Sequence, residues 1–221
     1  MGDIQSILIW AIPVLFAITV HEVAHGWMAN RLGDGSAKMM GRLTLNPIKH
    51  IDPIGTIAVP TLLYIISAGF IFGWAKPVPV NQSALRNPKS DMFWVALAGP
   101  GVNFIMAIIW LIIVAIGHNL NIPALVLMGG AGIFVNILLA VFNLLPLPPL
   151  DGGRVVSSLL PNKLAYQYDQ LEPYGLFILI GLLYFGVFGL IIWPIVVEII
   201  IFLSALSGLN ILELISALLT S

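Results

Sequence analysis

Two histidines and a glutamate lie in the stretch "ITVHEVAHGW", residues 18–27, whose other residues are almost all apolar. His21 and His25 are four positions apart, so on a helix both imidazoles project from one face and can reach one ion. H-E-x-x-H is the spacing with which two histidines ligate Zn²⁺ while the glutamate, here Glu22, acts as general base. The alternative is a polar helix face that is hydrogen-bonded to neighbouring helices.

A catalytic zinc site of this kind needs a third protein ligand, with the fourth position left for water. Asp151, in "FNLLPLPPLDGGRV", is the candidate. The prolines at 146, 148 and 149 prevent a regular helix before it, and such backbone is tolerated at membrane depth only where it lines a cavity or is buried in protein. The alternative for Asp151 is a turn residue before Gly152 and Gly153, since Asp-Gly is a common turn pair.

The composition indicates an integral membrane protein. Of the 221 residues, 59% are hydrophobic and only 9% charged, against roughly 25% charged in an average soluble domain. A net charge of −1 gives no basic field that would attract nucleic acid. The chain has no cysteine, so any metal must be held by His, Asp or Glu.

The hydropathy pattern predicts an all-α polytopic fold. A membrane-spanning helix needs about 20 mostly apolar residues, and five segments meet that length: 4–30, 92–117, 123–146, 174–190 and 191–217. A sixth apolar segment, 53–73, contains Pro60 and three glycines, which interrupt a helix. We therefore expect about five to six transmembrane helices, with a single domain over residues 1–221.

Three polar stretches, 31–53, 74–91 and 147–173, connect these segments. Their proline, glycine and asparagine content predicts loops with short extended pieces, and "KPVPVN" alternates like an edge strand.

The metal hypothesis also constrains the topology. His25 lies near the C-terminal end of its span and Asp151 follows the C-terminal end of another, so both ends must face the same side. The spans 92–117 and 123–146 supply two crossings, so segment 53–73 is predicted to be a re-entrant hairpin. All nine lysines and arginines then fall on one side, which the positive-inside rule identifies as the cytoplasmic side.

Three motifs, "HEVAH", "ALAGPGVN" and "NLLPLPPLDGG", in this order and in hydrophobic surroundings, resemble the site-2 protease family of intramembrane zinc metalloproteases. The stretches "GRLTLNPIKHIDPIGT" and "FGWAKPVPVN" further resemble a compact prokaryotic branch without PDZ or CBS domains. The resemblance covers residues from about 15 to 155, within a catalytic core of about 4–155. The C-terminal helices, about 174–217, match only in being hydrophobic.

The resemblance implies His21, His25 and Asp151 as ligands of Zn²⁺ and Glu22 as the base. Asn143 matches the family asparagine that holds the substrate carbonyl or its developing oxyanion. Asn103 matches a position of structural or substrate-contacting character.

The expected activity is that of an intramembrane zinc metalloendopeptidase in the cell membrane. It would hydrolyse peptide bonds within or near transmembrane helices of membrane-protein substrates, with its active site toward the cytoplasm. The alternatives are a membrane transporter or metal permease, or a proteolytically silent scaffold relative. His50, beside Asp52, is either a structural loop histidine or an additional ligand or gate, and no catalytic part is assigned to Glu198 or Glu213.

Overall fold

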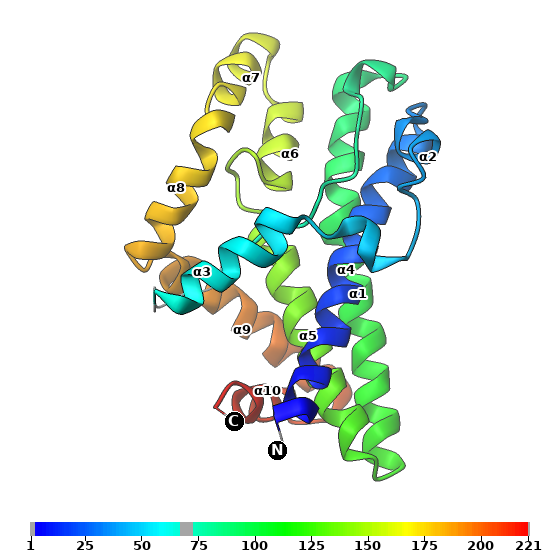
Figure 1. Ribbon diagram of the computed structural model, residues 1–221, viewed down its shortest axis with the longest axis vertical. Helices are drawn as coiled ribbons and strands as arrows, with labels where there is room; N and C mark the ends of the chain where they lie inside the picture. The colour runs from blue at the N-terminus through cyan, green and yellow to red at the C-terminus, as the bar shows by residue number, and fades with distance from the viewer. Residues whose placement is uncertain (1–2, 67–72, 221) are drawn as a thin grey trace.

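The computed structural model describes residues 3–66 and 73–220, and in this part of the chain the regular elements are all helical. Four helices are long and apolar enough to cross a membrane: α1 (Asp3–Arg31), α4 (Pro88–Asn119), α5 (Pro123–Asn143) and α9 (Val187–Ser207). Figure 1 shows α1, α4 and α5 side by side along the long axis of the molecule. These three helices confirm the first three spans predicted from hydropathy.

Shorter helices complete the described chain. They are α2 (Ser36–Met39), a π-helical turn (Pro53–Ala58) that continues into α3 (Val59–Ile65), α6 (Asp151–Leu159), α7 (Asn162–Asp169), α8 (Glu172–Tyr184) and α10 (Ile211–Thr220), with single 3₁₀ turns at Pro47–His50 and Gln82–Ala84. In Figure 1, α2, α6 and α7 lie at the end of the molecule opposite both termini.

The C-terminal spans differ from those predicted. The boundary expected between residues 190 and 191 is wrong, because the chain turns at Gly186, whose φ of 71° favours glycine. Pro194 lies inside α9, a position tolerated in membrane helices whose neighbours re-satisfy the backbone. The 13 residues of α8 are too few, at about 1.5 Å per residue, to cross a hydrocarbon core of about 30 Å.

The three central helices pack closely because glycines of α5 face large side chains of α4. A Cβ on Gly129 would lie 2.5 Å from Val114 Cγ2, and one on Gly132 would lie 2.3 Å from the Trp110 ring. Val114 and Trp110 are buried, as is Ile133 of α5. Small residues at the contact let membrane helices approach closely and gain van der Waals packing. This packing fixes the faces that α4 and α5 turn toward α1.

The two ends of segment 53–73 lie together. The Trp74 N–H donates to Gly55 O at 3.1 Å, and the Thr56 hydroxyl donates to Trp74 O at 2.8 Å. A single membrane crossing would separate its ends by about 30 Å. The hydrogen bonds thus join the two ends of the segment, while residues 67–72 of the predicted hairpin lie outside the described residues.

Residues 73–81 form a non-helical connection, without the strand pairing that "KPVPVN" led us to expect among the described residues. Hydrogen bonds to side chains hold this connection: Arg42 Nη2 donates to Lys76 O at 2.9 Å, and Asp34 Oδ2 accepts the Asn81 N–H at 2.6 Å. Burial alone would raise the pKa of the Asp34 carboxyl, but hydrogen bonds from Ser36 and Asn81 outweigh burial and lower that pKa. Asp34 therefore stays ionised and tethers the connection to the end of α1.

The glycine contact between α4 and α5 can be tested by adding one methyl group. Gly129→Ala should lower the free energy of unfolding by about 1–3 kcal/mol, because Val114 and the α4 backbone leave no room for a Cβ. The melting temperature of the purified protein should fall accordingly. Gly189→Ala in α9 is the matched control, since its Cβ would meet no atom within 4 Å. Equal melting temperatures for both variants would contradict this packing.

Candidate metal centre

Three potential ligand atoms converge where α1, α4 and the start of α6 meet. His21 Nε2 and His25 Nε2 lie 3.0 Å apart, because residues four positions apart share one face of α1. Asp151 Oδ2 lies 3.2 Å from His21 Nε2 and 3.3 Å from His25 Nε2. These are the only three His, Asp or Glu side chains in the described part of the chain grouped closely enough to hold one metal ion. The structure thus brings together the three predicted ligands.

Both imidazoles are oriented by oxygen acceptors on α4. His21 Nδ1 lies 2.7 Å from Asn103 Oδ1, and His25 Nδ1 lies 2.7 Å from the Val95 carbonyl oxygen. An oxygen of either kind only accepts, so each Nδ1 carries the proton and each Nε2 presents a lone pair. The two lone pairs then face each other and the Asp151 carboxylate.

This donor set fits a zinc ion. Asp151 Oδ2 is buried and receives no hydrogen bond from the described residues, which costs free energy unless a cation is present. Zinc bonds of about 2.0–2.1 Å in tetrahedral geometry place neighbouring ligand atoms about 3.3–3.4 Å apart. The observed separations of 3.0, 3.2 and 3.3 Å match one face of such a tetrahedron.

Gly99 of α4 makes room for both imidazoles. A Cβ at this position would lie 2.3 Å from His25 Nε2 and 2.6 Å from His21 Cε1. Any side chain larger than hydrogen would therefore displace the two rings. The next glycine of the "AGPG" sequence, Gly101, has no atom within 4 Å of its Cβ position, so only the first is demanded by the site.

Asp151 reaches the histidines because the loop before it folds back on the helix that it begins. A Cβ on Gly152 would lie 2.2 Å from Leu144 O, and one on Gly153 would lie 2.5 Å from Pro148 N. The two glycines of "LDGG" therefore allow the loop to pack against the first turn of α6. On the other side, Gly175 of α8 packs against the Pro148 carbonyl with no space for a Cβ.

A cavity of about 460 Å³ opens beside the ligands and is lined by Glu22 and Asn143 as well as by His21, His25 and Asp151. Glu22 Oε2 accepts the N–H of Val78, in the 73–81 connection, at 2.7 Å. Asn143, the last residue of α5, donates one amide hydrogen to Leu139 O at 2.9 Å. Its second amide hydrogen and its carbonyl oxygen remain for other partners.

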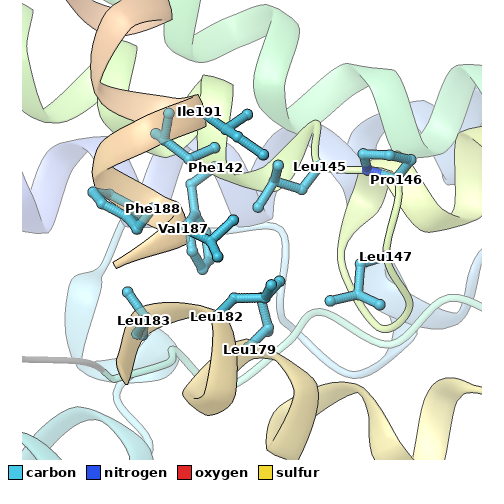
Figure 2. A pocket seen from close by; sticks show the side chains of 11 residues that line it. Phe142, Leu145, Pro146, Leu147, Leu179, Leu182, Leu183, Val187, Phe188 and Ile191 are labelled. Carbon is cyan, nitrogen blue, oxygen red and sulfur yellow. The ribbon is translucent and has the colours of Figure 1, made fainter. Parts of the chain in front are cut away.

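A neighbouring cavity of about 270 Å³ contains no polar lining side chain. Figure 2 shows apolar side chains from the end of α5, the following loop, α8 and the start of α9 around it. Leu179 of α8 borders both this cavity and the cavity beside the ligands. The apolar cavity can hold hydrocarbon but offers no group for catalysis.

The other titratable residues noted in the sequence lie elsewhere. His50 is buried, with Nε2 2.9 Å from Thr44 O, and is outside the three-ligand cluster. Glu213 of α10 accepts a hydrogen bond from Asn210, and neither it nor Glu198 of α9 lines the cavity beside the ligands.

Several known proteins are similar in sequence to this chain. The chain is 38% identical over 190 residues to YwhC of Bacillus subtilis (strain 168), which carries the name of a zinc metalloprotease, and the match covers 83% of each chain. The pattern of Peptidase family M50 matches residues 115–182. The chain belongs to this family, the site-2 protease family. Members of the family are zinc-dependent, so the protein is a membrane zinc metalloprotease.

Two more distant relatives match a similar share of the chain. Rip2 of Mycolicibacterium smegmatis, also named for a zinc metalloprotease, is 27% identical over 173 residues, and the match covers 76% of this chain and 64% of Rip2. Zinc metalloprotease MJ0392 of Methanocaldococcus jannaschii is 24% identical over 169 residues, with 75% of this chain and 39% of MJ0392 covered. No solved structure matches the chain significantly.

Sequence reasoning missed four groups that shape this centre: Gly99, the Val95 carbonyl, the Val78 N–H and Asn136, which binds Asn103 at 3.0 Å. Small residues in "ALAGPG" were a usable signal for close helix packing. The Val95 carbonyl and the Val78 N–H could not be predicted in this way, because every residue type except proline carries both backbone groups. Asn136, which lies in the interior of α5 with apolar neighbours on both sides, was a signal in itself, because a polar side chain inside a membrane helix needs a partner.

The fit of the imidazoles against α4 predicts that a methyl group on Gly99 disrupts the site without changing any ligand. Gly99→Ala should weaken zinc binding by about tenfold or more, a loss of the size seen when groups around a metal site are altered. The measurement is chelator competition on purified protein. Gly101→Ala is the control and should keep wild-type affinity, and an unchanged affinity in Gly99→Ala would refute the steric argument.

Proposed function

We propose that this protein is an intramembrane metalloendopeptidase that hydrolyses peptide bonds within or near transmembrane helices of membrane-protein substrates. His21, His25 and Asp151 hold the zinc ion, and Glu22 is the general base. The observation that carries the proposal is the meeting of three unprotonated ligand atoms, within 3.3 Å of one another, in a cavity that Glu22 also lines. That cavity lies among the helices of a membrane protein.

Zinc bound by these three residues supplies a Lewis acid that polarises a water molecule and the scissile carbonyl group. Glu22 takes the proton from that water and passes it to the leaving amine. The Val78 N–H donates to Oε2 of Glu22 at 2.7 Å and leaves Oε1 available to accept the water proton. This hydrogen bond also fixes the orientation of the carboxylate toward the cavity.

Asn143 stabilises the charge that develops on the substrate carbonyl oxygen. Its amide nitrogen keeps one hydrogen free after donating to Leu139 O, and it lines the same cavity as Glu22 and the ligands. A donor that is already oriented by its own helix loses little free energy in reorganising when the oxyanion forms.

A helical substrate must unwind before its backbone enters the site, because its carbonyl groups are hydrogen-bonded within the helix. The 73–81 connection borders the cavity through Trp74, Ala75, Pro77, Val78 and Val80. An unwound substrate segment in extended form lies along this connection and presents its carbonyl to the metal, as in recognition by strand addition. Helix-breaking residues in the substrate favour cleavage for this reason.

The site faces the cytoplasmic side of the cell membrane in this proposal. All lysines and arginines lie outside the four spanning helices or at their ends: Arg31, Lys38, Arg42, Lys49, Lys76, Arg86, Lys89, Arg154 and Lys163. The contact between Gly55 and Trp74 supports a re-entrant course for segment 53–73, which keeps all nine on one side. Positive residues accumulate in cytoplasmic loops.

The assignment of the base predicts the behaviour of Glu22→Gln. Cleavage of a model transmembrane substrate in proteoliposomes should fall by about 10²–10⁴-fold, because the amide cannot accept the water proton. The zinc content should stay at the wild-type value, since Glu22 is not a ligand in this proposal. Glu213→Gln, outside the cavity, is the control and should cleave normally. Normal cleavage by Glu22→Gln would rule out this base.

The topology is testable by cysteine labelling, because the chain has no cysteine of its own. Single cysteines replacing the exposed Met39 and Ser83, before and after segment 53–73, should react with an impermeant maleimide from the same side. A cysteine at Asn119, between α4 and α5, should react from the other side. Reaction of positions 39 and 83 from opposite sides would exclude the re-entrant hairpin.

A further inference from the structure

Two asparagines with no exposed surface extend from the metal centre into the core between α4 and α5. Asn103 Oδ1 lies 2.7 Å from His21 Nδ1, and Asn103 Nδ2 donates to Asn136 Oδ1 at 3.0 Å. Asn136 Nδ2 in turn donates to the Gly132 carbonyl oxygen, one turn earlier on α5, at 2.9 Å. Burying amide groups in an apolar interior costs free energy unless each is hydrogen-bonded. The three hydrogen bonds give the amide groups of Asn103 and Asn136 their partners.

The direction of all three hydrogen bonds follows from the last acceptor, the Gly132 carbonyl oxygen. The Gly132 carbonyl can only accept, so Asn136 must turn its NH₂ group there and its oxygen toward Asn103. Asn103 must then give its NH₂ group to that oxygen, which leaves its own oxygen for His21. Reversing either amide would place two donors or two acceptors against each other in a buried site.

We infer that Asn136 is a positioning residue for the metal centre, which acts through Asn103 to set the tautomer of His21. With the proton held on Nδ1, Nε2 must carry the lone pair that points at His25 and Asp151. His25 needs no such relay, because the Val95 carbonyl accepts its Nδ1 proton directly. This inference rests on the proposed function only in taking the three residues as ligands of one ion.

The inference predicts how two substitutions combine. Asn136→Leu leaves Asn103 free to turn its NH₂ group toward His21, so zinc affinity should fall by about tenfold. Adding Asn103→Asp to Asn136→Leu should restore most of that affinity, because a carboxylate has only acceptor oxygens and holds the Nδ1 proton of His21 in any orientation. The rescue is read in the Asn136→Leu background, since with Asn136 present the second carboxylate oxygen would face Asn136 Oδ1, another acceptor.

Chelator competition on each purified variant gives these affinities, with Ile137→Val as the matched control. Ile137 is fully buried beside Asn136 on α5 and takes no part in the hydrogen bonds that link Asn136 to His21, so its variant should bind zinc as wild type does. Unchanged affinity in Asn136→Leu would overturn the inference. A double variant that binds zinc no better than Asn136→Leu would also overturn it, because a merely structural role of Asn136 predicts no rescue by Asp at position 103.

A second measurement reads the tautomer without metal or activity. In ¹⁵N NMR spectra of histidine-labelled, metal-free wild type, His21, assigned by comparison with His21→Ala, should be protonated on Nδ1. A proton on Nε2 with none on Nδ1 would contradict the inference even if every variant failed to fold. Failure of wild type to bind zinc would refute the proposed function, while this spectrum would still decide on the relay.

Discussion

The Nε2 atoms of His21 and His25 face each other at 3.0 Å, while the Nδ1 atoms of both rings are held by oxygens of α4. With both rings neutral, their Nε2 lone pairs face each other, and the carboxylate of Asp151 adds negative charge within 3.3 Å of both. In surroundings of low dielectric this arrangement is unfavourable without a cation. The rest of the site is organised to keep these three atoms together until a metal ion binds.

Each surrounding element contributes one part of that organisation. Helix α4 supplies two acceptors and the open space at Gly99, so it orients the rings from behind without blocking their metal-facing atoms. Two glycines at the start of α6 let the preceding loop fold tightly and deliver Asp151. The 73–81 connection, fixed through Asp34 and Arg42, presents the Val78 N–H to Glu22. Ligand geometry, base orientation and cavity shape are therefore coupled through backbone contacts.

The grouping of His21, His25 and Asp151 could be predicted from sequence, because the histidines share a helix face by their spacing and Asp151 stands out after a proline-rich break. The close fit at Gly99 and the relay through Asn136 could not, since both depend on which faces of α4 and α5 turn toward α1. The C-terminal boundary was placed at 190/191, between the "FGVFG" stretch and Pro194, whereas the chain turns at Gly186 within that stretch and Pro194 lies inside α9. Among residues 3–66 and 73–220 the expected edge strand has no partner strand, which an alternating pattern cannot reveal.

The central claim is that two imidazoles and one carboxylate bind a single zinc ion inside this protein. Zinc K-edge X-ray absorption of the purified membrane protein tests it most directly. The account predicts zinc with two histidine nitrogens and an oxygen-rich remainder, and an imidazole signal reduced by one ligand in His21→Ala and in His25→Ala. A zinc ion without imidazole ligands, or a spectrum that neither substitution alters, would contradict it.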